Sequence, residues 1–186
     1  MRQAIDNAEE NLIHCGKELL AKTDYRNLTI QAIASASGMA IGTFYNYFRS
    51  KDEFIHRILN QEWDELLSRM EAKIKPGCAH KCAGHFIYHL IESYERKYAW
   101  YVSALCSGNS RQSEKYRLSC EENRRSLYQM LAKKLKAETA SGGFEIQLDY
   151  EKAVAYFVQL CVSTARNANL CFEDLWRFLH FRDLKA

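Results

Sequence analysis

The segment from Leu28 to Ile55 reads LTIQAIASASGMAIGTFYNYFRSKDEFI. Thr29 is a suitable N-cap for a short helix, in which Ile33 contributes to an apolar face before Gly38 interrupts the pattern. A second short helix is predicted from Ile41 to Phe48. Two helices of about two turns each bury too little surface alone and need supporting helices. The segment therefore predicts a helix-turn-helix, although a buried hairpin of an ordinary helical bundle fits the same pattern.

The flanking sequence also favours helices. Apolar residues recur at helical spacing from Ala4 to Leu20, and Ser50 is a suitable cap for a longer helix that closes near Pro76 and Gly77. Further helices are predicted over residues 78–106, 111–139, 150–168 and 172–184. With one proline and eight glycines in 186 residues, the chain is expected to be all-α. We expect a helix-turn-helix domain over residues 1–50, a connecting helix over 51–76, and a helical C-terminal domain over 77–186.

Charge along the chain gives weak support for contact with DNA. The net charge is only +3, which alone does not indicate a nucleic-acid partner. Between Tyr25 and Lys51, however, there is no acidic residue, and Arg26, Arg49 and Lys51 make this segment positive. A surface that approaches phosphates needs such a segment, because carboxylates there would repel the DNA backbone. A merely neutral helical hairpin would show the same feature.

Composition and motifs argue against several other classes of protein. The seven cysteines are odd in number and scattered in spacing, with no signal peptide before them, so we expect reduced thiols in the cytoplasm. No apolar run is long enough to span a bilayer. We find no glycine-rich phosphate loop, nucleophile elbow or HExxH motif, and therefore expect neither an enzyme nor a cofactor.

The segment from Leu28 to Ile55 resembles the DNA-binding domain of the TetR family of bacterial repressors. The resemblance covers about the first 60 residues, whereas the remainder is similar only in length and helical pattern. It depends on a set of residues at the family's spacing: Thr29, Ile33-Ala34, Gly38, Gly42-Thr43-Phe44-Tyr45, Tyr47-Phe48 and Lys51.

The resemblance implies which residues contact DNA. Ile41, Gly42 and Tyr45 stand where family members approach base edges in the major groove. The positions at which family members touch phosphates are Thr29, Thr43, Asn46, Tyr47 and Lys51. Hydroxyl, amide and ammonium donors suit phosphate contacts, which position a protein on DNA without specifying sequence.

Three positions depart from the family pattern. Ala40 stands where serine is usual, so a helix cap or phosphate donor is missing. Ile41 replaces a frequent lysine or arginine, which favours contact with a thymine methyl over guanine readout. Asp24 replaces the usual glycine after the first helix.

Beyond residue 77, two features suggest a sensing and dimerisation domain. Tyr94, Tyr98 and Tyr101 share a helical face that suits an apolar pocket with hydroxyl handles, although an ordinary aromatic core fits equally well. The last two helices have broad apolar faces, and the resemblance implies that such helices pair across a two-fold axis. The residues expected at this dimer interface are Phe157, Cys161, Leu175, Trp176 and Leu179.

Cysteines and histidines also share a helical face near the start of this domain. Cys78, Cys82, His85 and His89 lie at i, i+4, i+7 and i+11, and thiolates and imidazoles suit zinc. Cys78 and His89 would be about 16 Å apart along a straight helix, so these four residues cannot all bind one ion. We assign no metal, and a mixed, partly exposed helix face is the simpler interpretation.

The resemblance implies a homodimeric repressor that binds a pseudo-palindromic operator in double-stranded DNA and is released by a small-molecule effector. Two alternatives stay open: a repressor that senses metal or redox state through the Cys78/Cys82/His85/His89 face, and a helical adaptor that binds only proteins.

Overall fold

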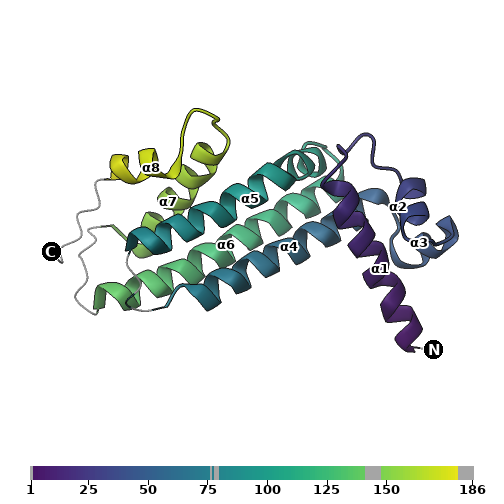
Figure 1. The fold of residues 1–186 in the computed structure, drawn as a ribbon, viewed down its shortest axis with the longest axis horizontal. Helices are drawn as coiled ribbons and strands as arrows, with labels where there is room; N and C mark the ends of the chain where they lie inside the picture. Colours follow the sequence, from purple (N-terminus) through teal and green to yellow (C-terminus); the bar gives the residue numbers. More distant parts are fainter. Residues whose placement is uncertain (1, 76, 78–79, 141–147, 180–186) are drawn as a thin grey trace. The chain divides into compact units, whose positions relative to one another are not determined.

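A computed structural model of the chain describes residues 2–75, 77, 80–140 and 148–179. Within these residues the protein is all-α, as predicted, and has eight helices (Figure 1). The helices are α1 (Arg2–Leu20), α2 (Ile30–Ala36), α3 (Ile41–Tyr47), α4 (Lys51–Lys73), α5 (His80–Cys106), α6 (Arg111–Ala140), α7 (Tyr150–Ala165) and α8 (Phe172–Leu179). None of the described helices combines the length and apolarity that a membrane span requires.

The predicted helix boundaries agree closely with the structure. The Thr29 hydroxyl oxygen accepts a hydrogen bond from the Ala32 amide at 3.1 Å, which caps α2. The Ser50 hydroxyl oxygen likewise accepts from the Glu53 amide at 3.1 Å, at the start of α4. α7 ends at Ala165, earlier than predicted. The predicted end of α8 lies outside the described residues.

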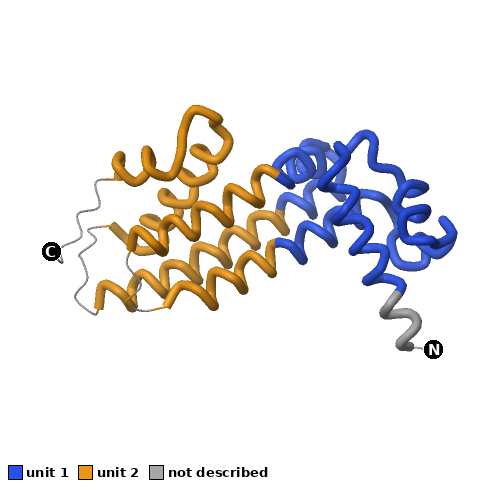
Figure 2. Tube along the Cα trace, in the orientation of Figure 1, with its two compact units in different colours: residues 1–62, 97–117 blue, residues 63–96, 118–186 orange. Residues whose placement is uncertain are grey.

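The chain forms two compact units, which Figure 2 distinguishes by colour. Unit 1 consists of residues 1–62 and 97–117, and unit 2 of residues 63–96 and 118–186. These boundaries differ from those expected, because the end of α5 belongs with the N-terminal helices. Its Tyr98 hydroxyl donates to Glu62 at 2.7 Å, and its Tyr101 hydroxyl donates to the Leu20 carbonyl at 3.2 Å.

An aromatic cluster forms the core of unit 1 beneath α3. Phe44, Phe48 and Phe54 are each at most 3% exposed, and their ring centroids lie 4.9–5.4 Å apart. Helix α1 packs onto this cluster through Gly16, where an added Cβ would collide with the Phe54 ring. Close packing of this kind holds α3 in one orientation.

Unit 2 has a separate core between its helices. Met70, Leu127 and Cys161 are fully buried there, and the Phe172 side chain at the start of α8 is 2% exposed. Burial raises the pKa of the Cys161 thiol to about 12. Helix α8 approaches α5 at Gly84, where an added Cβ would lie 3.0 Å from the Trp176 ring.

Candidate nucleic-acid interface and effector cavity

The turn between α2 and α3 has the backbone of a helix-turn-helix. Gly38 has φ +68°, a left-handed conformation that favours glycine over residues with a Cβ. The next residue, Met39, donates its amide to the Ala34 carbonyl at 2.9 Å, which closes the turn against α2. The chain therefore reverses at Gly38, the residue that interrupts the helical pattern in the sequence.

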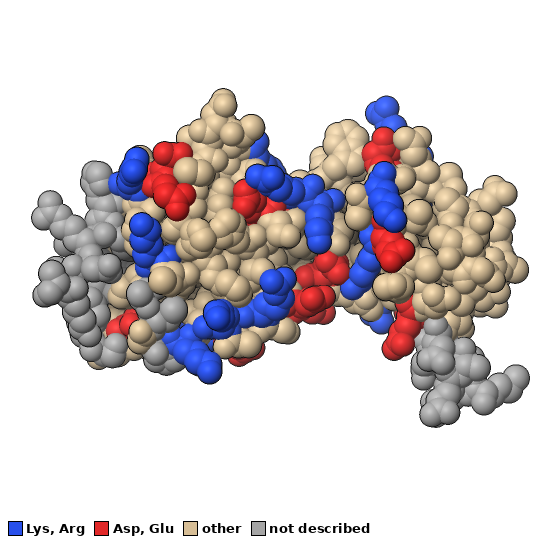
Figure 3. All heavy atoms as spheres, viewed as in Figure 1, with Lys and Arg blue, Asp and Glu red and all other residues tan. Residues whose placement is uncertain are grey.

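Helix α3 presents different residues to the core and to the outside. Phe44 is fully buried, whereas Ile41 is 43% exposed and Tyr45 is 54% exposed. Gly42 and Asn46 are exposed as well. In the view of Figure 3 the surface over α2 and α3 is largely free of charged side chains. The side of α3 that we predicted to enter a major groove is thus accessible.

Four other residues predicted to contact DNA are exposed to different degrees. Thr43 and Tyr47 are half-buried, and the Tyr47 ring lies 6.4 Å from the Phe48 ring. Thr29 is exposed and caps α2. The Lys51 ammonium donates to the Tyr25 carbonyl at 2.8 Å and lies 4.3 Å from the centre of the Tyr25 ring. Lys51 therefore has a structural role within unit 1, which sequence reasoning missed.

The two remaining departures from the family pattern have visible consequences. Ala40 precedes α3 with extended backbone and makes no side-chain cap, as predicted. The Asp24 carboxylate accepts hydrogen bonds from the amide and the side chain of Asn27, at 2.9 and 3.1 Å. This turn leads the chain from α1 towards α2. The spacing of Asp24 and Asn27 in the sequence is the signal that could have predicted it.

Tyr25 connects the loop before α2 to the first turn of α4. Its hydroxyl donates to the Asp52 carboxylate, and its ring lies 6.4 Å from the Tyr101 ring. Burial and the hydrogen bond to Asp52 raise the pKa of Tyr25 well above its usual value, so it remains neutral. These contacts fix the loop on which Thr29 lies.

The three tyrosines predicted to bind an effector have partners within the chain. The Tyr98 hydroxyl and Lys17 both donate to Glu62, and these bonds lower the pKa of Glu62 even though partial burial opposes the shift. Tyr101 donates to backbone carbonyls after α1. Tyr94 packs edge-on against Trp63 in unit 2, with ring centroids 5.1 Å apart. That these tyrosines contact an effector stays a prediction.

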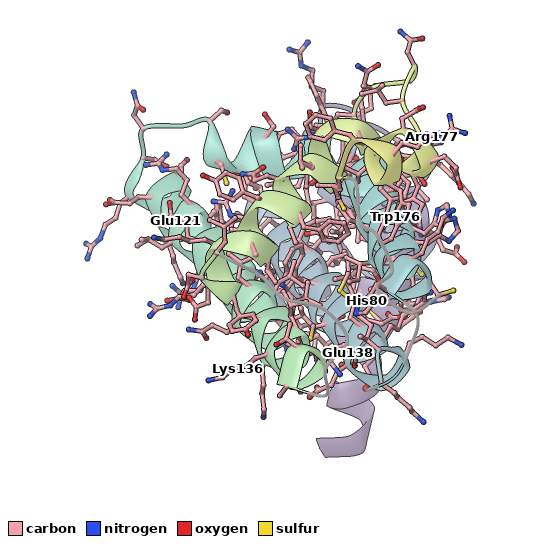
Figure 4. The ribbon with its side chains drawn as sticks, turned by 90° about the vertical axis from the view of Figure 1, so that its left-hand side faces the viewer. His80, Glu121, Lys136, Glu138, Trp176 and Arg177 are labelled. Carbon is pink, nitrogen blue, oxygen red and sulfur yellow. The ribbon has the colours of Figure 1, made fainter. Side chains whose placement is uncertain are left out.

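Unit 2 contains a cavity of about 380 Å³. Its wall is mainly apolar, and Figure 4 shows His80 and Trp176 on the inner side of the helices, with Lys136 directed away. Lys75, Lys133 and Glu138 also line the cavity. Tyr94, Tyr98 and Tyr101 are not among its lining residues. The principal apolar lining residues are Ile74, Ile87, Met130, Leu131, Leu135, Val154, Phe157 and Trp176.

The residues predicted for a dimer interface pack largely within one chain. Cys161 is fully buried and Leu175 is 4% exposed, so neither is available to a partner in this structure. Phe157 and Trp176 are half-buried and line the cavity, and Leu179 is half-buried too. The dimer interface expected at these five residues stays a prediction. On the same two helices Tyr156 is 65% exposed and Phe178 is 72% exposed.

The predicted cysteine and histidine face is only partly assembled. Cys78 lies outside the described residues, and Cys82 is exposed. His85 and His89 contact each other, with their Nε2 atoms 3.0 Å apart. Across the part of the chain that the structure describes, no three His, Cys, Asp or Glu side chains converge as metal ligands.

The N-terminal segment is similar to known regulatory proteins. Residues 12–58 match the family described as "Bacterial regulatory proteins, tetR family". The fatty acid metabolism regulator protein of Bacillus subtilis (strain 168) is 30% identical over 64 residues. This matched segment is 34% of the present chain and 33% of that relative. The sequence similarity therefore concerns the N-terminal part.

Solved structures extend the similarity to the fold of most of the chain. FadR of Bacillus subtilis, in complex with stearoyl-CoA, has a TM-score of 0.64 at 18% identity and covers 92% of this chain and 89% of its own. A regulator from Saccharomonospora viridis, in complex with choline, has a TM-score of 0.73 at 15% identity, with 94% of both chains covered. The segment of residues 12–58 is thus similar to the N-terminal domain of the TetR family of bacterial regulatory proteins, and most of the chain shares its fold with these two solved regulators.

Proposed function

We propose that this chain is a transcriptional repressor, which binds a pseudo-palindromic DNA operator as a homodimer and is released by a small-molecule effector. The observation that carries the proposal is the outward side of α3, where Ile41, Tyr45 and Asn46 are exposed while Phe44 anchors the helix beneath. A helix held in this manner can enter a major groove with its side chains at base edges. The match of residues 12–58 to the tetR family of bacterial regulatory proteins supports the same function.

DNA binding is tested by selecting bound fragments from the source genome and measuring their affinity by fluorescence anisotropy. Tyr45→Ala removes an exposed side chain of α3 and is expected to weaken operator binding about tenfold, within the range of one good base contact. Trp100→Ala is the matched control, because Trp100 is an equally exposed aromatic residue of unit 1 on α5.

Salt dependence separates this proposal from the protein-adaptor alternative. A repressor that neutralises phosphates loses affinity steeply as salt concentration rises. Absence of duplex binding at low salt, for every selected fragment, would favour an adaptor.

For the homodimer, we propose the outward faces of α7 and α8 around Tyr156 and Phe178. Large exposed aromatic side chains are typical of protein interfaces, where their burial supplies affinity. A two-fold dimer would place two α3 helices at half-sites about 34–36 Å apart. Phe178→Glu is expected to yield monomers in sedimentation analysis. Leu118→Glu alters an exposed apolar residue of α6 and serves as the control; a dimer that survives Phe178→Glu contradicts this interface.

For the effector, we propose an amphiphile with a long apolar tail and an anionic head, held in the cavity of unit 2. The apolar wall suits a hydrocarbon tail, and Lys75 and Lys133 supply positive charge at its lining. The structural relative bound to stearoyl-CoA supports this class. The relative bound to choline suggests a cationic effector instead, which Trp176 and Phe157 could hold through their ring faces.

Calorimetric titration with stearoyl-CoA and with choline distinguishes these two classes. We expect stearoyl-CoA to bind and to release operator DNA. The double variant Lys75→Ala/Lys133→Ala is expected to weaken that binding several-fold, in line with the modest energy of exposed ion pairs. Lys136→Ala is the control, since Lys136 lies on α6 but does not line the cavity. Binding of choline alone would reject the anionic class while leaving the DNA-binding proposal intact.

A further inference from the structure

Two histidines on α5 lie one turn apart with their ring nitrogens close together. The Nε2 atoms of His85 and His89 are separated by 3.0 Å, and the rings are nearly perpendicular, with centroids 4.2 Å apart. Both side chains are exposed. The pair lies on α5 in unit 2, and neither histidine is among the residues that line the cavity.

Each ring is held in place by a different neighbour. The Nδ1 atom of His89 lies 3.2 Å from the Glu92 carboxylate, to which it donates. Glu92 is itself fixed by Arg96, whose guanidinium donates to it at 2.8 Å. The His85 ring packs edge-on against Phe172 of α8, with centroids 4.8 Å apart.

The contact with Glu92 also decides where the proton of His89 lies. With hydrogen on Nδ1, the Nε2 atom of His89 carries a lone pair that can bind a metal ion. A carboxylate that accepts from the outer nitrogen of a histidine ligand is the usual support at metal sites. For neutral His85 to bind as well, its ring hydrogen moves from Nε2 to Nδ1, so that both Nε2 lone pairs face the ion.

We propose that His85 and His89 together bind a divalent transition-metal ion, Ni²⁺ or Cu²⁺, at the surface of unit 2. With nitrogen–metal bonds of about 2.0–2.1 Å, the 3.0 Å separation gives a nitrogen–metal–nitrogen angle of roughly 90°. This angle suits square-planar or octahedral ions better than tetrahedral zinc. Water completes the coordination, because no third side-chain ligand converges on the pair among the described residues. The inference does not depend on the proposed repressor function.

Titration of the purified full-length protein with NiCl₂, followed by calorimetry, tests this site. One equivalent of Ni²⁺ is expected to bind, and excess Mg²⁺ is not expected to compete, since imidazole ligands suit Ni²⁺ but not Mg²⁺. Either His85→Gln or His89→Gln should reduce affinity by at least about tenfold, because loss of a supporting residue alone costs roughly 10–100-fold. Glu92→Gln alters such a supporting residue and should weaken binding by about tenfold, which is less than the loss of either ligand costs.

Two controls make the result specific. His14→Gln removes an exposed histidine of α1 whose side chain is 73% exposed, and it should leave Ni²⁺ affinity unchanged. Cys82→Ser removes the exposed thiol one turn before His85 and should also leave it unchanged. Full affinity in His89→Gln, in which only an exposed side chain is altered, would overturn the proposal, as would loss of binding in Cys82→Ser.

Discussion

Aromatic side chains form the core beneath α3 and also line the cavity of unit 2, but the two regions are packed differently. Phe44, Phe48 and Phe54 touch one another and are at most 3% exposed. Phe157 and Trp176, in contrast, border a cavity of about 380 Å³. A filled core holds a helix in one orientation for DNA, whereas a cavity leaves room for a ligand.

The largest effect is expected where the filled core is emptied. Phe44→Ala should lower the free energy of unfolding by about 3–5 kcal/mol, because it removes the buried ring that anchors α3 and leaves a cavity. Urea denaturation measures the change. Tyr45→Ala, one residue further along and 54% exposed, should change stability by less than about 0.5 kcal/mol. Equal effects of the two substitutions would show that α3 is not anchored as described.

The next largest difference in stability is expected when a small side chain is enlarged in each region. Ala34→Leu places extra methyl groups where α2 meets α3, at a side chain that is 1% exposed, and should cost about 1–3 kcal/mol through overpacking. Ala153→Leu adds the same groups to the wall of the cavity, where they have room, and should be neutral or stabilising by up to about 2 kcal/mol. Thermal unfolding of both variants measures the two changes in stability. A large loss of stability in Ala153→Leu would contradict the presence of free space at the cavity wall.

Two glycines near α3 should respond in opposite directions. An added Cβ would meet no atom within 4 Å at Gly38 or at Gly42, so backbone conformation alone decides the outcome. Gly38→Ala should destabilise by about 1–2 kcal/mol, because φ is +68° there. Gly42→Ala lies within a helix and should stabilise by about 0.5–1 kcal/mol. Urea midpoints that move in the same direction would refute this assignment.

The smallest effects concern the caps of α2 and α3. Thr29→Ala removes the hydroxyl that caps α2 and should cost about 1 kcal/mol. Ala40→Ser supplies a cap that α3 lacks and should gain up to about 1 kcal/mol. Hydrogen exchange of the two helices, measured by mass spectrometry, would detect slower exchange in α3 of Ala40→Ser. Unchanged exchange there would mean that the new hydroxyl does not reach the helix amides.

Local features of the fold followed closely from the sequence. The short helices on either side of Gly38, the cap at Thr29 and the start of α4 were all predicted, because each depends on residues within one or two turns. The exposed side of α3 followed from the same segment, since Phe44 and Phe48 occupy the buried side. The family resemblance supplied the DNA-binding interpretation, which periodicity alone left open.

Residues far apart in the sequence decided the rest. Helices α7 and α8 have apolar side chains on several sides, so periodicity could not tell that Cys161 and Leu175 pack inside the chain while Tyr156 and Phe178 are exposed. The shared helical face of Tyr98 and Tyr101 likewise could not tell that their hydroxyls donate to Glu62 and to the backbone at the end of α1. Helical spacing is a property of neighbouring residues, whereas burial depends on which distant helix packs against them. The sequence alone therefore determined the helices and the DNA-binding motif, and the tertiary structure determined the cavity and the surfaces that remain open.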